Sequence, residues 1–420
     1  MRLSKDVIKG VGSCLTASLF FFYVILQMNL YNSLNNQIVD LYHLTPTVFG
    51  FVSSLYFYFA AIFLIPAGLL IDYVSNKKLL IVLLFLMSIT ALLNALTINT
   101  VLLSLYRIAS GIGNSFAFLL CMRTAVLWFP KRSGLAIGWC ITIGMLGGVA
   151  QSPFYLTYSY FGWHYLMLVN GGLGLFILLL GFFCYRQASQ REIIPNVYRL
   201  IKSVKIKLIS VIRNWKNALC GIYTGLLNLP VMTLSAAWGS AFLYHAHHIS
   251  QASADFVIGM IYVGMIVSSP VIGGLADNYK SKRPFMMALG SILSILCISV
   301  IIYVTALSVW MLAILFFILG AVTTAQIISY PIVGDVNNKK NAGIAMSWVS
   351  VLIYLIGAFS NNIFGWMLNL HNTDKTVTYT SFDYQFAMST LLASFFVALL
   401  VALVLYKMIN YQHNSQKSYY

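Results

Sequence analysis

Long apolar blocks, separated by short polar segments, run the length of the chain. The blocks are about 20 residues long, which is the length that an α-helix needs to cross roughly 30 Å of hydrocarbon. A membrane β-barrel would instead alternate apolar and polar residues in segments of about 10, and the sequence shows no such alternation. We therefore predict twelve membrane-spanning helices, near residues 12–34, 47–71, 79–98, 101–122, 135–158, 165–185, 218–243, 254–276, 285–305, 309–333, 343–368 and 385–408.

Composition agrees with this prediction and explains the charge. Apolar residues make up 60% of the 420 residues and charged residues only 8%, against roughly 25% charged residues in soluble domains. A net charge of +16 would suit nucleic acid, but the short connections leave no room for a nucleic-acid-binding domain. With the N-terminus in the cytoplasm, every Lys and Arg except Lys375 and Arg107 falls on the cytoplasmic side. This positive-inside pattern predicts that both termini are cytoplasmic.

The longest polar segment, residues 186–217, divides the chain near its middle. We predict an N-terminal six-helix bundle at 1–185, a cytoplasmic basic linker at 186–217 and a C-terminal six-helix bundle at 218–420. Within the linker, apolar residues from Val197 to Val211 recur at helical spacing, with basic residues between them. This spacing is typical of an amphipathic helix on a lipid surface, and a partner-binding role is the alternative.

A segment after the second predicted span is repeated after the eighth. Each copy has a Gly one turn before an Asp, followed by a basic cluster. Internal repeats of this kind point to two halves that rock about a central site. A carboxylate at the membrane edge can face a helix N-terminus or pair with a basic residue, as Asp72 could with Arg123. We predict a cytoplasmic gate, with a solvated turn as the alternative, at Gly68, Asp72, Lys77, Arg123, Gly273, Asp277, Arg283 and Asp335.

The repeated segments resemble the signature loop of the major facilitator superfamily, Gly-x-Leu-Ala-Asp-Arg-x-Gly-Arg-Lys. The second copy, GGLADNYKSKR from Gly273, keeps the Gly, Leu, Ala, Asp and basic end, whereas the first has Tyr73, Ser75 and Asn76 where the family has Arg, Gly and Arg. The stretch from Arg107 to Gly113 resembles the fourth-helix motif of this superfamily. The resemblance covers essentially the whole chain. It implies an all-α integral membrane protein with twelve transmembrane helices in two pseudo-symmetric six-helix bundles, which transports by alternating access.

Shorter segments are similar to the proteobacterial intraphagosomal amino-acid transporter family. They are Tyr56-Phe-Tyr58 with Pro66-Ala-Gly68, Trp128 to Arg132, Gly144 to Pro153, Phe161-Gly162-Trp163, Trp238-Gly239 with Phe242-Leu243, and Gly343-Ile-Ala345. This resemblance implies import of amino acids, or of nucleosides in some members, across a bacterial inner membrane. Asp335 and Asn361 depart from it, because a Glu and a Gln are expected there, and these departures bear on the substrate. The fifth span also lacks the Gly-Pro-x-x-Gly-Gly element of drug exporters, which favours uptake.

Arg107 is the one full charge predicted inside a span. Burying it costs at least about 2.5 kcal/mol, so its guanidinium either binds a substrate carboxylate in a bidentate fork or ties helices together through backbone carbonyls. Uncharged polar residues near mid-membrane also need partners, from substrate or from other helices, and Pro230 and Pro331 could mark helix bends. The predicted substrate pathway joins Arg107 to Tyr23, Gln27, Tyr58, Asn114, Gln151, Asn228, Trp238, Gln326, Tyr330 and Asn361.

The sequence offers no evident proton carrier. The nine acidic residues and seven histidines fall in predicted loops or at helix ends. Coupling would then use an edge group such as Asp40, Asp255 or Asp335, or the protein would be a facilitator. His245, His247 and His248 cluster at the outer end of the seventh span, where a wet loop explains them better than a metal site. The six cysteines lack metal-ligand spacing and are predicted to be small buried residues.

Together these patterns predict a secondary transporter, not an enzyme, with no cofactor and no metal. We expect it to import a small polar metabolite, an amino acid in the first instance, with H⁺ as the coupling ion. We also expect a monomer in the lipid bilayer, without a nucleic-acid partner. Three alternatives stay open: an exporter of drugs or siderophores with the same fold, a nucleoside importer, and a membrane receptor that does not transport.

Overall fold

The computed structural model describes residues 5–187, 197–304, 306–338, 341–370 and 379–417. Every regular element within these residues is a helix, which confirms the all-α prediction. The chain forms two compact units, residues 1–196 and 197–420. The division falls inside the segment that we predicted as the linker, residues 186–217.

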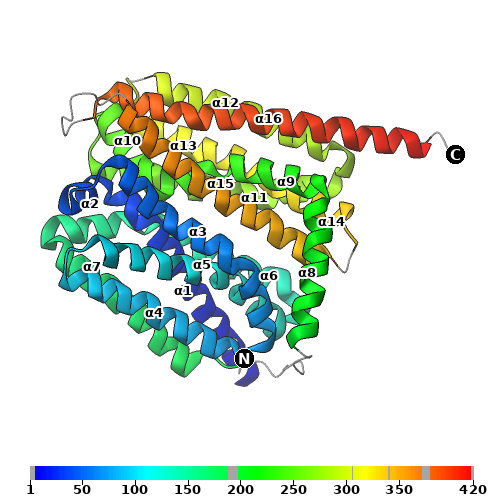
Figure 1. The fold of residues 1–420 in the computed structure, drawn as a ribbon, viewed down its shortest axis with the longest axis horizontal. Helices are drawn as coiled ribbons and strands as arrows, with labels where there is room; N and C mark the ends of the chain where they lie inside the picture. The colour runs from blue at the N-terminus through cyan, green and yellow to red at the C-terminus, as the bar shows by residue number, and fades with distance from the viewer. Residues whose placement is uncertain (1–4, 188–196, 305, 339–340, 371–378, 418–420) are drawn as a thin grey trace. The chain divides into compact units, whose positions relative to one another are not determined.

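The first unit consists of long helices joined by short turns (Figure 1). They are α1 (Lys5–Ser33), α2 (Asn35–Tyr42), α3 (Pro46–Tyr73), α4 (Asn76–Leu96), α5 (Thr100–Trp128), the 3₁₀ turn η1 (Pro130–Arg132), α6 (Ser133–Val149) and α7 (Gln151–Cys184). Polar side chains at the turns set helix starts: the Thr45 hydroxyl accepts a hydrogen bond from the amide of Val48, and the Asn99 side chain accepts one from that of Val101. Such caps satisfy amides that have no partner within the helix.

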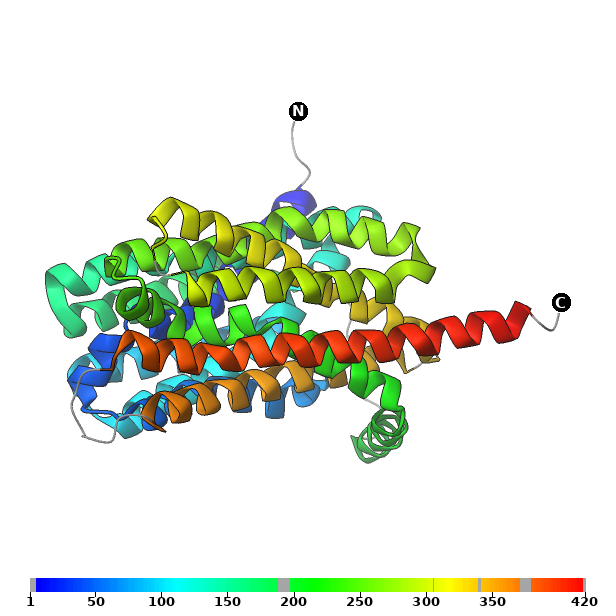
Figure 2. The same ribbon diagram turned by 90° about the horizontal axis from the view of Figure 1, so that it is seen from above.

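The second unit repeats this plan with less regular helices. It contains α8 (Val197–Arg213), α9 (Trp215–Leu227), the π-helix η2 (Pro230–Trp238), α10 (Gly239–Ala246), α11 (Gln251–Asn278), the 3₁₀ turn η3 (Lys280–Lys282), α12 (Arg283–Tyr303), α13 (Val309–Thr323), the 3₁₀ segment η4 (Thr324–Ile328), α14 (Ser329–Val336), α15 (Ala342–Leu370) and α16 (Ser381–Lys417). Figures 1 and 2 both show α12 and α16 lying side by side. The linker helix predicted from Val197 onward is present as α8, and its contact with lipid stays a prediction.

Helix pairing shows the internal repeat. In the first unit, α3 packs on α5, α1 on α6, and α4 on α7. In the second unit, α11 packs on α13, α9 on α15, and α12 on α16. In the first unit, therefore, the second span packs on the fourth, the first on the fifth and the third on the sixth. In the second unit, the eighth span packs on the tenth, the seventh on the eleventh and the ninth on the twelfth, which is the same pairing six spans later. The two pseudo-symmetric six-helix bundles are therefore confirmed.

Eleven helical stretches in the described ranges are long and apolar enough to span a membrane. One of them, Leu135–Cys184, has 50 residues and holds both the fifth and sixth predicted spans. Gly162 interrupts it with a φ of 79°, a backbone conformation that glycine adopts without steric cost. With this break counted, the twelve predicted spans are all present.

Candidate functional site

Arg107 lies on α5 in the first unit and is 0% exposed. One terminal nitrogen donates to the carbonyl of Gln27 on α1 at 3.0 Å, and the other to the carbonyl of Ser53 on α3 at 2.9 Å. The guanidinium also lies over the rings of Tyr31 and Tyr56, 4.1 and 4.9 Å from their centroids. This arrangement, the Arg107 cage, combines charge-assisted hydrogen bonds with cation–π contacts.

The Arg107 cage contains polar atoms that could form further hydrogen bonds. Among the described residues, the Arg107 Nε and the hydroxyls of Tyr31 and Ser53 are buried without a hydrogen-bond partner. A buried polar atom without a partner costs about 1–3 kcal/mol, so three of them around one buried cation mark a place where a polar ligand or water would be stabilised. Both predicted roles of Arg107 therefore have support: it ties α1, α3 and α5 together and it retains an N–H for a ligand.

A second layer of amides and hydroxyls surrounds the cage. Gln27 and Asn170 exchange side-chain hydrogen bonds of 2.7 and 3.2 Å. The Tyr106 hydroxyl donates to the Gln27 amide oxygen and accepts from Asn170 at 3.0 Å, and the Tyr23 hydroxyl donates to the Asn170 carbonyl at 3.1 Å. Gln151 accepts from Asn32 at 3.1 Å. Buried networks of this kind hold side chains in one arrangement.

Close helix packing at Gly111 supports the cage. A Cβ atom at Gly111 would overlap the carbonyl oxygen of Tyr56 and lie about 3.0 Å from its Cα. The backbones of α5 and α3 therefore meet beside Tyr56, which brings its ring to the guanidinium. Two further pathway residues lie on these helices: Tyr58 is partly exposed on α3, and the Nδ2 of Asn114 on α5 is buried without a hydrogen-bond partner among the described residues.

In the second unit the seventh and tenth spans depart from α-helical geometry. Residues Pro230–Trp238 form the π-helix η2, and Thr324–Ile328 form the 3₁₀ segment η4. The Gln326 amide, in η4, donates to the Asn228 side chain at 3.0 Å. Asn361 donates to the carbonyl of Met232 at 2.8 Å. Broken helical geometry is found at functional sites in membrane spans, since it redirects backbone polar groups.

Other pathway residues surround these segments. Trp238 stacks on Phe364 with a centroid distance of 5.0 Å, and the Tyr330 hydroxyl lies 3.4 Å from the Ser350 hydroxyl. As in the cage, buried polar atoms remain without partners in the part of the chain that the structure describes: Ser235 Oγ, Ser329 Oγ and Asn361 Oδ1. The structure thus gathers Asn228 with Gln326, and Asn361 with η2, as parts of one polar region in this unit.

The structure adds to one prediction about titratable groups and corrects another. Asp255 lies near a helix end, in the second turn of α11, but it is buried: it is 1% exposed and accepts hydrogen bonds from Ser240 at 2.6 Å and Gln251 at 3.3 Å. The helix starts earlier than the apolar block because Ser250 caps it. His247 does not lie in a wet loop: it is buried, with its Nε2 2.9 Å from the Ile301 carbonyl.

The predicted gate residues of the second unit come together. The buried Arg283 guanidinium donates to Asp335 at 2.6 Å and to the Ala276 carbonyl at 2.8 Å, and lies 3.7 Å from Asp277. Both carboxylates are mostly exposed. These contacts join the ends of α11 and α14 to the start of α12. A Cβ atom at Gly273 would have no described atom within 4 Å.

The first-unit gate is only partly described. The side chain of Asp72 lies outside the described residues, so its pairing with Arg123 stays a prediction. Lys77 donates to the Phe182 carbonyl at 2.5 Å and lies over the Phe182 ring. It therefore ties the start of α4 to the end of α7. Gly68 resembles its counterpart in the second unit, because a Cβ atom there would also meet open space among the described residues.

The twelve spans, the repeated pairing and the buried polar clusters define a membrane transporter of the two-bundle class. The chain belongs to the Major Facilitator Superfamily, whose family model matches residues 15–244 and 220–418.

Two curated relatives are transporters. The chain is 23% identical over 400 residues to the uncharacterized transporter YybO of Bacillus subtilis, an alignment that covers 88% of this chain and 86% of the relative. It is 28% identical over 151 residues to the probable sulfoacetate transporter SauU of Cupriavidus necator, but that alignment covers only 36% of this chain and 35% of the relative.

Solved structures share the fold. A bacterial homolog of the human lysosomal transporter Spinster, in an inward-facing conformation, has a TM-score of 0.75 at 15% identity, over 96% of this chain and 97% of that one. The nucleoside transporter NupG has a TM-score of 0.76 at 14% identity, over 93% and 99% of the two chains. At such identities the likeness shows the fold alone.

Proposed function

We propose that this transporter imports a small metabolite that bears a carboxylate, an amino acid in the first instance. The observation that carries the proposal is the Arg107 cage, in which a buried guanidinium keeps an N–H without a partner among the described residues, beside two hydroxyls in the same state. A carboxylate offers two acceptor oxygens in the geometry of the guanidinium fork. Because Arg107 is fully buried here, binding requires Tyr31 or Tyr56 to move off the guanidinium.

The second unit supplies complementary groups. The ammonium of an amino acid needs acceptors, and the Asn361 Oδ1 and the hydroxyls of Ser235 and Ser329 are buried acceptors without partners in the described part of the chain. Transport would proceed by alternating access, as in other transporters of this superfamily. The resemblance to the intraphagosomal amino-acid family and the fifth-span sequence support import. The positive-inside pattern supports an inner-membrane location with both termini in the cytoplasm.

Asp255 is our candidate for the proton carrier. Ionisable groups buried in a span are functional by default, and a carboxyl that accepts from a hydroxyl and an amide can hold or release a proton in place. Import would then be coupled to H⁺, and the transporter would act as a monomer, since each bundle pair contains one set of these groups.

A ligand panel tests the proposal. Purified protein is melted with amino acids, nucleosides and apolar efflux drugs, and a ligand that binds the folded state raises Tm by mass action. We expect shifts with one or a few amino acids, lost in Arg107→Ala and kept in Arg213→Gln, which removes an exposed arginine. Shifts with nucleosides alone, or with apolar drugs alone, would replace the proposal by nucleoside import or by export.

A small organic dianion is the second candidate substrate. The partial likeness to a probable sulfoacetate transporter and the buried guanidinium both favour it. Sulfoacetate therefore belongs in the same panel. A shift with sulfoacetate and none with amino acids would assign the Arg107 cage to this substrate class instead.

A further inference from the structure

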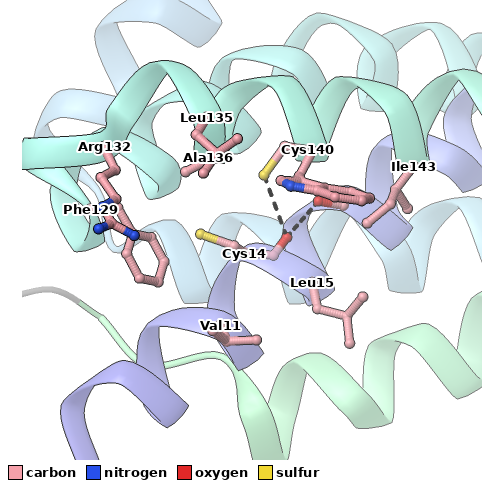
Figure 3. Close-up of a pocket in the computed structure, with 11 residues that line it drawn as sticks. Val11, Cys14, Leu15, Phe129, Arg132, Leu135, Ala136, Cys140 and Ile143 are labelled. Carbon is pink, nitrogen blue, oxygen red and sulfur yellow. Dashed lines mark hydrogen bonds between the residues drawn. The ribbon is translucent and has the colours of Figure 1, made fainter. Parts of the chain in front are cut away.

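A groove in the first unit lies apart from the Arg107 cage. It runs between α1 and α6 with a volume of about 370 Å³ (Figure 3). Its residues on α1 end at Ser18, whereas Gln27 of the cage lies nine residues further on, roughly 13 Å along the helix. The groove is therefore a separate feature, which the proposed transport mechanism does not use.

Apolar side chains form its walls. Leu135 and Trp139 on α6 are 62% and 64% exposed, and Val11 and Leu15 on α1 are also exposed. Ser18 also lines the groove, but its hydroxyl already donates a hydrogen bond to the backbone carbonyl of Cys14 at 2.7 Å. A groove whose walls are apolar along its length suits a hydrocarbon chain.

One end of the groove differs from the rest. Figure 3 shows Arg132 and Phe129 at one end and Ile143 at the other. Arg132 is exposed, and within the described residues its guanidinium has no hydrogen-bond or ion-pair partner. One cation at the end of an apolar groove is complementary to an amphiphile with one anionic head group, because the guanidinium fork matches a carboxylate.

We propose that this groove binds a long-chain carboxylate taken from the membrane. Its head group pairs with Arg132, and its chain lies along α6 from Leu135 to Ile143. Leu135 and Ile143 are eight positions apart, roughly 12 Å along the helix, and the groove between two helices takes one chain. The proposal is independent of the substrate of the Arg107 cage.

Native thiols report on the groove. Cys14 and Cys140 line its floor, and Cys184 is exposed elsewhere in the same unit. The detergent-purified full chain is treated with an apolar maleimide, and mass spectrometry follows labelling at each cysteine. We expect oleate to slow labelling of Cys140 and Cys14 about tenfold and to leave Cys184 unchanged, whereas oleyl alcohol protects much less.

Two variants distinguish recognition of the carboxylate head group from binding of the hydrocarbon chain alone. Arg132→Gln should reduce protection by oleate to that by oleyl alcohol, while Arg213→Gln, another exposed arginine, should keep it. Equal protection by oleate and oleyl alcohol in the unmodified chain would overturn the proposal. So would protection only by phosphatidylglycerol, which would assign the groove to a phospholipid, or failure of the maleimide to reach Cys140, which would show the groove to be closed.

Discussion

The two units share a helix arrangement and differ in their buried chemistry. The first unit places a cation between aromatic rings on regular helices, with Arg107 at its centre. The second unit places neutral amides on broken helices, η2 and η4, and buries a carboxylate at Asp255. The pairing of spans is the same in both. The repeat therefore determines where helices pack, while a few polar residues determine what each unit can bind.

The difference also indicates how each unit can change. The Arg107 cage is held by side chains, so a ligand can enter by exchanging one set of side-chain contacts for another. In η2 and η4 the backbone itself departs from the α-helix, and such segments often mark hinges or functional sites. We expect the first unit to determine charge selectivity and the second to accommodate the shape of the substrate.

The largest effect is expected at the cage. Arg107→Ala should lower uptake about 100-fold, because losing one partner of a buried charge pair costs roughly 2–5 kcal/mol. Arg107→Lys should recover little, since an ammonium lacks the planar fork that reaches two carbonyls and a carboxylate together. Uptake by proteoliposomes is the measurement, with protein content as the control. Uptake unchanged in Arg107→Ala would limit Arg107 to a structural role.

The second largest effect is expected at Asp255, the buried carboxylate of the second unit that we propose as the proton carrier. One proton moving through a potential of 100 mV supplies about 2.3 kcal/mol, enough for roughly 50-fold accumulation. Asp255→Asn, which resembles the protonated carboxyl, should abolish accumulation and leave substrate exchange across the membrane intact. Both are measured in proteoliposomes with an imposed proton gradient. Accumulation at the unmodified level would remove Asp255 as the carrier.

A smaller effect is expected from the amide pair in the broken helices. Asn228→Ala leaves the buried Gln326 amide without its partner, a loss of about 1–3 kcal/mol, so it should weaken substrate binding about tenfold. Gln326→Ala should weaken binding less, because the Asn228 amide that it leaves is only partly buried. The double variant should lose less binding free energy than the sum of the losses in the two single variants. Binding measured by Tm shift gives all three values, and strict additivity would show that the pair does not act as a unit.

The smallest effect is expected at the gate of the second unit. Asp335→Asn should destabilise the folded protein by about 1 kcal/mol, because its carboxylate is mostly exposed and solvent screens the pair. Asp277→Asn should cost less, since its oxygen lies 3.7 Å from Arg283 rather than 2.6 Å. Thermal unfolding of the two variants compares them directly. The reverse order would mean that Asp277 is the main partner of Arg283.

Much of the fold could be predicted because the membrane constrains helix length. Blocks of about 20 apolar residues located all twelve spans, and the break at Gly162 falls between the fifth and sixth of them. Pro230 pointed to the bend where η2 begins. The π-helix itself could not be predicted, because it depends on contacts such as that between Asn361 and the Met232 carbonyl.

The site was predicted in outline and missed in detail. Arg107 and Gln27 were singled out because polar groups in apolar spans need partners. Tyr31 and Tyr106 were missed because the ring that faces a given neighbour depends on helix rotation, which hydropathy does not report. Asn170 could have been found, since an amide in the sixth span meets the same criterion as Gln27. The burial of Asp255 was missed, because it depends on contacts with Ser240 and Gln251 that hydropathy does not report.

The central claim is that the Arg107 cage recognises a carboxylate. The most direct measurement is the Tm shift given by an amino acid that stabilises the purified protein, compared with the shift given by its carboxamide. We predict that the amino acid shifts Tm in the unmodified chain, that the carboxamide does not, and that Arg107→Lys abolishes the difference. Equal shifts by acid and amide, or a difference that survives in Arg107→Lys, would contradict the account.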